Sequence, residues 1–243
     1  MNGLEPRVFV VNGEQSTQKI LADLLATKNY SVEIFSGATE FLARAPHRSP
    51  ACVVLELLRG FDGLALQRHL TQIGRAEQIV FIGEHSDLRL GIEAVKRGAV
   101  DFLPKPFRDD ELFCAVARAL TRSAEVVASR ARLAKLTPRE FEVFRWMIAG
   151  LINKEIGAEM DVTLRTVKAH RTAVMRKIGV LSVVELVRLA LVAGIAPAQP
   201  SIASRAKCNC RQDSTNNSLI LTNYFAQSPK DCIRNSPAIS LSL

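Results

Sequence analysis

Residues 51–57 read ACVVLEL, a continuous apolar run interrupted near its end by one carboxylate, Glu56. An apolar run without alternation predicts a strand buried on both faces, as in a parallel sheet covered by helices. Similar short runs lie on both sides of it, and together they predict strands at 7–11, 31–35, 51–57, 78–83 and 101–103. Amphipathic stretches separate these runs at 15–27, 38–45, 63–73 and 87–97, and a last helix is expected to begin near Asp109.

This alternation of strands and helices predicts an α/β fold, a doubly wound (flavodoxin-like) domain with a five-stranded parallel sheet. Reactive groups in such sheets lie at the carboxyl ends of the strands. The residues expected at that edge are Asn12, Gly13, Glu56, Gly83 and Lys105.

A second, all-α domain with four helices is predicted to follow. Thr137 can cap a helix, Pro138 suits its first position, and Glu140 completes a capping box. Helices are expected at 138–149, at 153–160, from Thr163 to about 178, and at 182–193. We therefore divide the chain into a first domain at 1–120, a helical linker at 121–136, a helical domain at 137–196 and a tail at 197–243. The Ser, Asn, Gln and Pro content of the tail predicts disorder.

The net charge of +8 is confined to the second half of the chain. Residues 1–120 carry 14 basic and 15 acidic side chains, whereas residues 137–195 carry nine basic and six acidic ones. Residues 163–179 contain five basic side chains and no acidic one. Such a local cluster suits a polyanion better than a generally basic surface would.

Membrane, metal and enzyme classes have little support in the sequence. No apolar run of 18 or more residues and no signal peptide is evident, so a cytoplasmic protein without membrane contact is expected. Cys52 and Cys114 lie in apolar runs and are expected to be buried thiols. Cys208, Cys210 and Cys232 form a poor zinc pattern, and neither a metal nor another cofactor is expected. The absence of a Gly-rich phosphate loop and of a catalytic constellation argues against an enzyme.

The helix expected from Thr163 has one apolar and one basic face. At about 100° per residue, Val167, Val174 and Ile178 fall on one stripe, which is expected to face the core. The outward face is basic with small residues at its centre, and comprises Lys168, Ala169, Thr172, Arg165 and Arg176. Small side chains let a helix enter the major groove of DNA while Lys and Arg reach base edges and phosphates. The alternative is a solvated basic face without a ligand, which the tight turn between two helices makes less attractive.

Residues 136–180, LTPREFEVFRWMIAGLINKEIGAEMDVTLRTVKAHRTAVMRKIGV, closely resemble the LuxR-type helix-turn-helix of NarL/FixJ-class response regulators. The matching motifs are LTPRE, AGLINKEIG and TLRTVKAHRTAVMRKIG. The resemblance implies that Lys168, Ala169 and Thr172 face base edges of double-stranded promoter DNA. The basic side chains expected at phosphates are Arg165, Arg176, Lys154 and Arg171, the last of which leans toward the apolar stripe.

The first domain resembles the receiver of the same class, most closely in RVFVVN (7–12) and GIEAVKRGAVDFLPKPF (91–107). In that family a Lys-Pro dipeptide, its peptide bond often cis, follows the fifth strand, and a switch aromatic precedes it. Lys105, Pro106 and Phe102 match these positions. The family's reaction needs an aspartate that accepts a phosphoryl group, carboxylates that hold Mg²⁺, and a hydroxyl whose contact with the phosphate draws the aromatic inward.

The sequence departs from this pattern at each of those groups. Glu56, longer by one methylene, stands in place of the aspartate. Asn12 and Gly13 stand in place of the metal-binding acidic pair, and Gly83 replaces the switch hydroxyl. Together these departures predict a degenerate (pseudo-)receiver that is not phosphorylated. Glu14 alone would make a poor Mg²⁺ site.

Two roles for Glu56 remain open. It can pair with Lys105 as a standing, weaker mimic of the phosphorylated state, or the pair can simply fill an inactive pocket. The leading hypothesis is a DNA-binding transcription regulator that needs no aspartyl phosphorylation and forms a homodimer through 87–97, the fifth strand and 109–120. The alternative is an interaction protein whose receiver sequesters a histidine kinase or another regulator.

Overall fold

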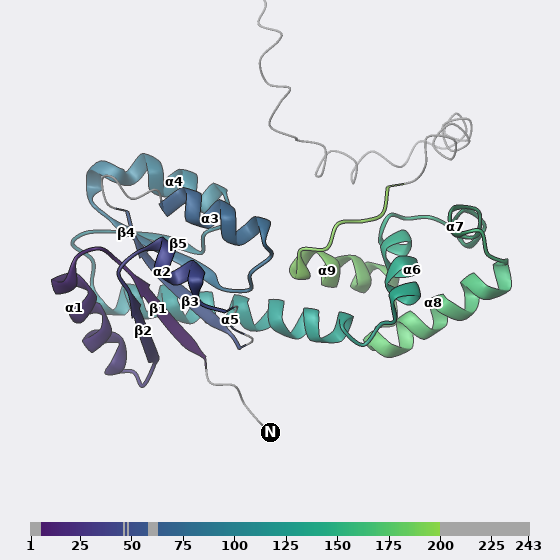
Figure 1. Ribbon diagram of the computed structural model, residues 1–243, viewed down its shortest axis with the longest axis horizontal. Coiled ribbons are helices and arrows are strands. Elements are labelled where there is room, and N and C mark those ends of the chain that lie inside the picture. Colours follow the sequence, from purple (N-terminus) through teal and green to yellow (C-terminus); the bar gives the residue numbers. More distant parts are fainter. Residues whose placement is uncertain (1–5, 46, 48, 58–62, 200–243) are drawn as a thin grey trace, which may run out of the picture. The chain divides into compact units, whose positions relative to one another are not determined.

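The computed structural model describes residues 6–45, 47, 49–57 and 63–199, which form two successive domains along the chain (Figure 1). From residue 200 onward, the tail predicted to be disordered lies outside the described residues, and so do Cys208, Cys210 and Cys232. No helix in the described part is long and apolar enough to cross a membrane.

The first domain contains the predicted parallel sheet. Its strands are β1 (Arg7–Val11), β2 (Ser31–Phe35), β3 (Ala51–Glu56), β4 (Gln78–Gly83) and β5 (Asp101–Pro104). They follow the order β2-β1-β3-β4-β5, and every neighbouring pair is parallel. The central strand β3 is buried along its whole length, which explains its unbroken apolar run. The predicted ends differ from the observed ones by one residue, at β3 and β5 only.

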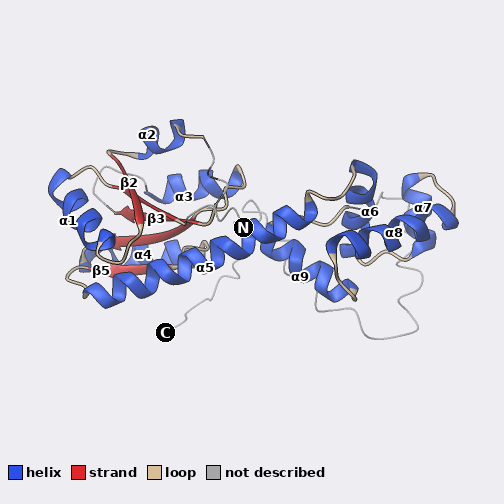
Figure 2. Cartoon of the chain, turned by 90° about the horizontal axis from the view of Figure 1, so that it is seen from below, coloured by secondary structure: helices blue, strands red, loops and turns tan. Residues whose placement is uncertain are grey.

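Helices cover both faces of this sheet, as the doubly wound fold requires (Figure 2). They are α1 (Gln15–Ala26), α2 (Ala38–Ala43), α3 (Gly63–Gln72), α4 (Leu88–Lys96) and α5 (Asp109–Leu133), with a 3-10 turn at His85–Asp87 before α4. One apolar cluster joins the sheet to α1 and α5. A second cluster joins the opposite face to α2, α3 and α4.

Helix α5 continues without a break beyond the sheet to Leu133, so most of the predicted linker at 121–136 is helical and belongs to the same helix. Ser123 fixes it to the starts of two strands, because its buried hydroxyl donates to the Ala76 carbonyl at 2.9 Å and accepts the Ala51 N–H at 3.0 Å. Cys52 is buried as predicted, but the prediction for Cys114 was wrong. Its side chain is exposed because α5 turns other positions toward the sheet, namely Leu112, Ala115, Val116 and Ala119.

The second domain is all-α. Its helices are α6 (Pro138–Ile148), α7 (Asn153–Met160), α8 (Leu164–Ile178) and α9 (Val183–Ala193). The capping box predicted for α6 is present: Thr137 Oγ1 accepts the Glu140 N–H at 3.3 Å, and a Glu140 carboxylate oxygen accepts the Thr137 N–H at 2.8 Å. Thr163 caps α8 in the same way, through the N–H of Thr166. These caps satisfy N–H groups that a helix leaves free at its first turn.

A tight turn joins α7 to α8. Asp161 ends α7 in the left-handed conformation, with φ of 52°. Gly157 makes the close approach possible, because a Cβ there would lie only 2.9 Å from the Val162 carbonyl oxygen. The turn sets α8 against the domain core, where the predicted apolar stripe is buried.

Candidate phosphoacceptor pocket and nucleic-acid interface

The carboxyl edge of the sheet gathers the residues that the sequence placed there. Glu56 is the last residue of β3, and Gly83 is the last residue of β4. Asn12 directly follows β1, and Lys105 directly follows β5. Parallel strands bring these ends to one edge, so residues that are up to 93 positions apart in the sequence become neighbours (Figure 1).

The Glu56 carboxylate is engaged at both of its oxygens. Lys105 Nζ forms an ion pair with Oε1, and Asn12 Nδ2 donates a hydrogen bond to Oε2. The Glu56 side chain is 4% exposed, whereas that of Lys105 is 26% exposed. Asn12 is held in turn by the Glu14 N–H, which donates to its Oδ1 at 2.9 Å. The negative charge of the buried carboxylate is therefore compensated by the chain's own groups.

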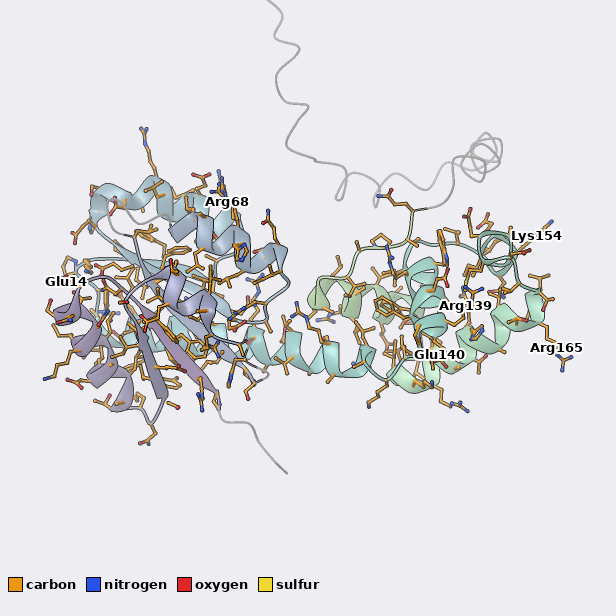
Figure 3. All side chains as sticks on the ribbon, in the orientation of Figure 1. Glu14, Arg68, Arg139, Glu140, Lys154 and Arg165 are labelled. Carbon is orange, nitrogen blue, oxygen red and sulfur yellow. The ribbon has the colours of Figure 1, made fainter. Side chains whose placement is uncertain are left out.

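Glu14 lies at the same edge, at the start of α1 (Figure 3). Its two carboxylate oxygens accept hydrogen bonds of 2.8 Å from the Ser16 and Thr17 hydroxyls. These bonds, led by that of Thr17, lower the pKa of Glu14. Both oxygens of the carboxylate thus accept hydrogen bonds from side chains in the first turn of α1. Within the described residues, no group of three His, Cys, Asp or Glu side chains could hold a metal ion.

An aromatic ring lies close to Gly83, which stands at the position of the switch hydroxyl. A Cβ added to Gly83 would lie 3.0 Å from Cε2 of Phe102, on the neighbouring strand β5. Phe102 packs against the apolar cluster under α2, α3 and α4. On the other side of the pocket, His85 Nδ1 lies 3.0 Å from the Lys105 carbonyl oxygen, and the Lys105–Pro106 peptide bond is cis. The sequence did not reveal the contact of the ring with Gly83.

The outward face of α8 has the predicted composition. Its exposed residues include the central group of Lys168, Ala169 and Thr172, together with Arg165 and Arg176. Val167, Val174 and Ile178 are buried on the opposite side. Figure 3 shows Arg165 extending from the N-terminal part of α8, with Lys154 on the neighbouring α7. Both are exposed.

Arg171 differs from the other basic residues of α8. It is partly buried, and its Nη1 lies 3.5 Å from the Leu151 carbonyl oxygen, before α7. Burial lowers the pKa of its guanidinium. Its inward lean agrees with the helical periodicity of the sequence, and this geometry fits bracing of α8 at least as well as a DNA contact.

Lys177 is also turned away from the outward face, toward α6. Its Nζ contacts a Glu140 carboxylate oxygen at 2.6 Å. The Lys177 ammonium and the Thr137 N–H together lower the pKa of Glu140 to about 2. One carboxylate therefore caps α6 and ties it to the C-terminal part of α8. This contact fixes the orientation of the basic face relative to the rest of the domain.

Comparisons with known proteins agree with this geometry. The family model described as "Response regulator receiver domain" matches residues 8–117, and that described as "Bacterial regulatory proteins, luxR family" matches residues 134–190. The transcriptional regulatory protein FixJ of Bradyrhizobium diazoefficiens is 37% identical over 196 residues, which cover 77% of this chain and 96% of FixJ. The chain belongs to the NarL/FixJ class of response regulators.

Further relatives of this response regulator include the response regulator protein TmoT of Ectopseudomonas mendocina. It is 32% identical over 197 residues, covering 78% of this chain and 90% of TmoT. The solved structure of response regulator StyR is 37% identical, covers 77% of this chain and 98% of that chain, and has a TM-score of 0.49. The NarL/FixJ-class regulator described here is thus a transcription regulator with a receiver domain and a LuxR-type DNA-binding domain.

Proposed function

We propose that this response regulator binds promoter DNA as a homodimer and needs no aspartyl phosphorylation to do so. The observation that carries the proposal is the state of Glu56, whose two carboxylate oxygens are both engaged inside the pocket. A phosphoryl acceptor attacks the donor through a carboxylate oxygen. The burial of Glu56, and the pairing of its two oxygens with an ammonium and an amide, oppose that attack.

The remainder of the pocket supports the same proposal. Phosphoryl transfer in this class needs Mg²⁺, which prefers several oxygen ligands. Asn12 and Gly13 offer no carboxylate, and that of Glu14 is committed to Ser16 and Thr17. We therefore describe the domain as a degenerate receiver.

Of the two roles for Glu56, an inactive pocket fits the contacts better than a mimic of the phosphorylated state. A phosphoaspartate carries a charge of about −1.5 to −2 and several acceptor oxygens. Glu56 carries a single charge that Lys105 already neutralises. The hydroxyl that would transmit the presence of phosphate is missing, because residue 83 is glycine.

The proposed DNA interface is the exposed basic face of α8. Lys168, Ala169 and Thr172 lie where base edges would meet the helix. The basic side chains proposed to contact phosphates are Arg165, Arg176, Lys154 and, with the weaker geometric support described above, Arg171. Homodimerisation is proposed through α4, β5 and the first part of α5, so that two DNA-binding domains read two half-sites.

Sequestration of a histidine kinase or another regulator is the second candidate function, because α4 of the receiver carries exposed apolar side chains that a partner protein could cover. The two candidates differ in their dependence on DNA. If sequestration is the function, Lys168→Ala leaves the biological effect intact. The exposed basic face of α8, with small residues at its centre, favours DNA binding.

The proposal is tested by incubating the purified full-length protein with Mg²⁺ and acetyl phosphate. Intact-mass spectrometry should detect no acyl phosphate, and affinity for a selected DNA site should be unchanged. The triple variant Asn12→Asp, Gly13→Asp, Glu56→Asp is the matched control, because it restores the acceptor and the metal carboxylates. A stable acyl phosphate on the wild-type protein, together with tighter DNA binding, would overturn the proposal.

A further inference from the structure

Two glycines, one on β4 and one on α4, lie close to the ring of Phe102. Gly83 ends β4, next to β5, and a Cβ there would lie 3.0 Å from Phe102 Cε2. Gly91 lies on the buried side of α4, and a Cβ there would be 2.8 Å from Phe102 Cδ2 and closer still to Cγ and Cδ1. The approach at Gly91 is closer than real Cβ contacts, so a side chain there requires the ring or the helix to move, whereas at Gly83 the ring would have to yield by only a few tenths of an ångström. The two glycines therefore form a slot that only this pair of small residues leaves open.

Gly91 needs a packing explanation, because glycine is unfavourable in the interior of a helix. The slot supplies one. Ala94, one turn further along the buried side of α4, is also small and fully buried. These small residues let α4 lie close to β5 with the Phe102 ring between them. The Phe102 ring is thus part of the surface against which α4 packs.

One flank of α4, beside its buried side, carries exposed apolar side chains. Leu88, Ile92 and Val95 follow helical spacing, and each is between 44% and 50% exposed. Ile92 directly follows Gly91, so any displacement of the helix at the slot moves this apolar stripe. The position of the ring against α4 therefore bears on how this flank is presented to solvent.

We propose that Phe102 is a fixed wedge, held by Gly83 and Gly91, that keeps α4 in one position over β5 without a phosphoryl group. In the switch that the family resemblance implies, the aromatic ring moves inward when a hydroxyl at position 83 binds the phosphate, and outward when the phosphate is lost. Here residue 83 has no hydroxyl, and the ring itself occupies the space beside it. This role of Phe102 rests on the proposed function at one point, namely that the surface of α4 and β5 forms the dimer.

Gly91→Ala in the full-length protein tests the wedge, with Gly37→Ala as the matched control. Gly37 has nothing within 4 Å of an added Cβ, so its substitution should change nothing. Gly91→Ala should speed amide hydrogen exchange in 88–104 at least tenfold. It should also weaken self-association, measured by sedimentation, by at least tenfold. Unchanged exchange in 88–104 would overturn the proposal.

Phe102→Ala keeps the test decisive if Gly91→Ala alone does not fold. When the ring is absent, alanine at 91 should fold and exchange like the Phe102→Ala single variant. If Gly91→Ala speeds hydrogen exchange in the Phe102→Ala variant as much as it does in the wild-type protein, the proposal is contradicted, because the clash would then involve a group other than the ring. If the wild-type protein sediments as a monomer at every concentration, the proposed dimer fails, while the exchange comparison still decides the wedge.

Discussion

The pocket at Glu56 and the face of α8 both concentrate charge, but they use it in opposite ways. In the pocket, one buried carboxylate is matched by Lys105 and Asn12, so the charges stabilise each other. On α8, Lys168, Arg165 and Arg176 are exposed on the face proposed to bind DNA. The charge of Glu56 is compensated inside the protein and therefore serves the structure. The basic charges of α8 face solvent and are therefore available to an acidic ligand.

The largest expected effect comes from breaking the pocket. Lys105→Ala leaves Glu56 buried without its cation, which should lower the free energy of unfolding by about 3 kcal/mol. Urea unfolding of the full-length protein measures this loss. Adding Glu56→Gln should recover most of it, since no uncompensated charge remains. A Lys105→Ala variant as stable as the wild-type protein would show that the pair is not a structural element.

The next effect concerns sequence reading by α8. Lys168→Ala should reduce affinity for a selected DNA site by about 1–3 kcal/mol and reduce the discrimination between that site and random DNA. Binding to both DNAs at a fixed salt concentration checks this. The stability of the protein should not change, because Lys168 is exposed.

Lys154→Ala sharpens the distinction between base and phosphate contacts. It should weaken binding to all DNA sequences alike and reduce the magnitude of the salt slope by about 0.9. The measurement is a series of dissociation constants against salt concentration. A loss confined to the selected site would instead assign Lys154 to base recognition.

The last prediction concerns the pH dependence of stability and involves Glu140. Its pKa is lowered from 4.5 to about 2 in the folded protein, mainly by Lys177. The carboxylate therefore binds protons more weakly when folded, and its contribution to stability is complete above pH 4.5 and lost as the pH falls through about 2. Glu140→Gln should make the stability of the DNA-binding domain less dependent on pH within that window. An identical pH dependence in the two proteins would contradict the role of this contact.

Local sequence patterns predicted much of the fold. Strand ends were correct to within one residue, because unbroken apolar runs mark buried strands. The helix caps at Thr137 and Thr163 were also predictable, because capping depends on neighbouring residues. Cys114 was mispredicted, since the apolar run around it does not show which side of α5 faces the sheet.

The candidate sites were predictable to different extents. Strand topology brought Glu56 and Lys105 to one edge, and helical periodicity separated the two faces of α8. The slot around Phe102 was not predictable, because Gly83, Gly91 and Phe102 meet only through tertiary packing. The domain boundaries and the individual DNA contacts stay predictions.

DNA selection at near-physiological salt, with the untreated full-length protein and, beside it, the isolated fragment 130–196, decides whether the receiver couples two DNA-binding domains without phosphorylation. The account predicts that the full-length protein enriches paired half-sites and binds them more tightly than the fragment, because a standing receiver dimer couples two DNA-binding domains. DNA binding by the fragment alone would contradict the account, since the receiver would then inhibit binding until another signal relieved it.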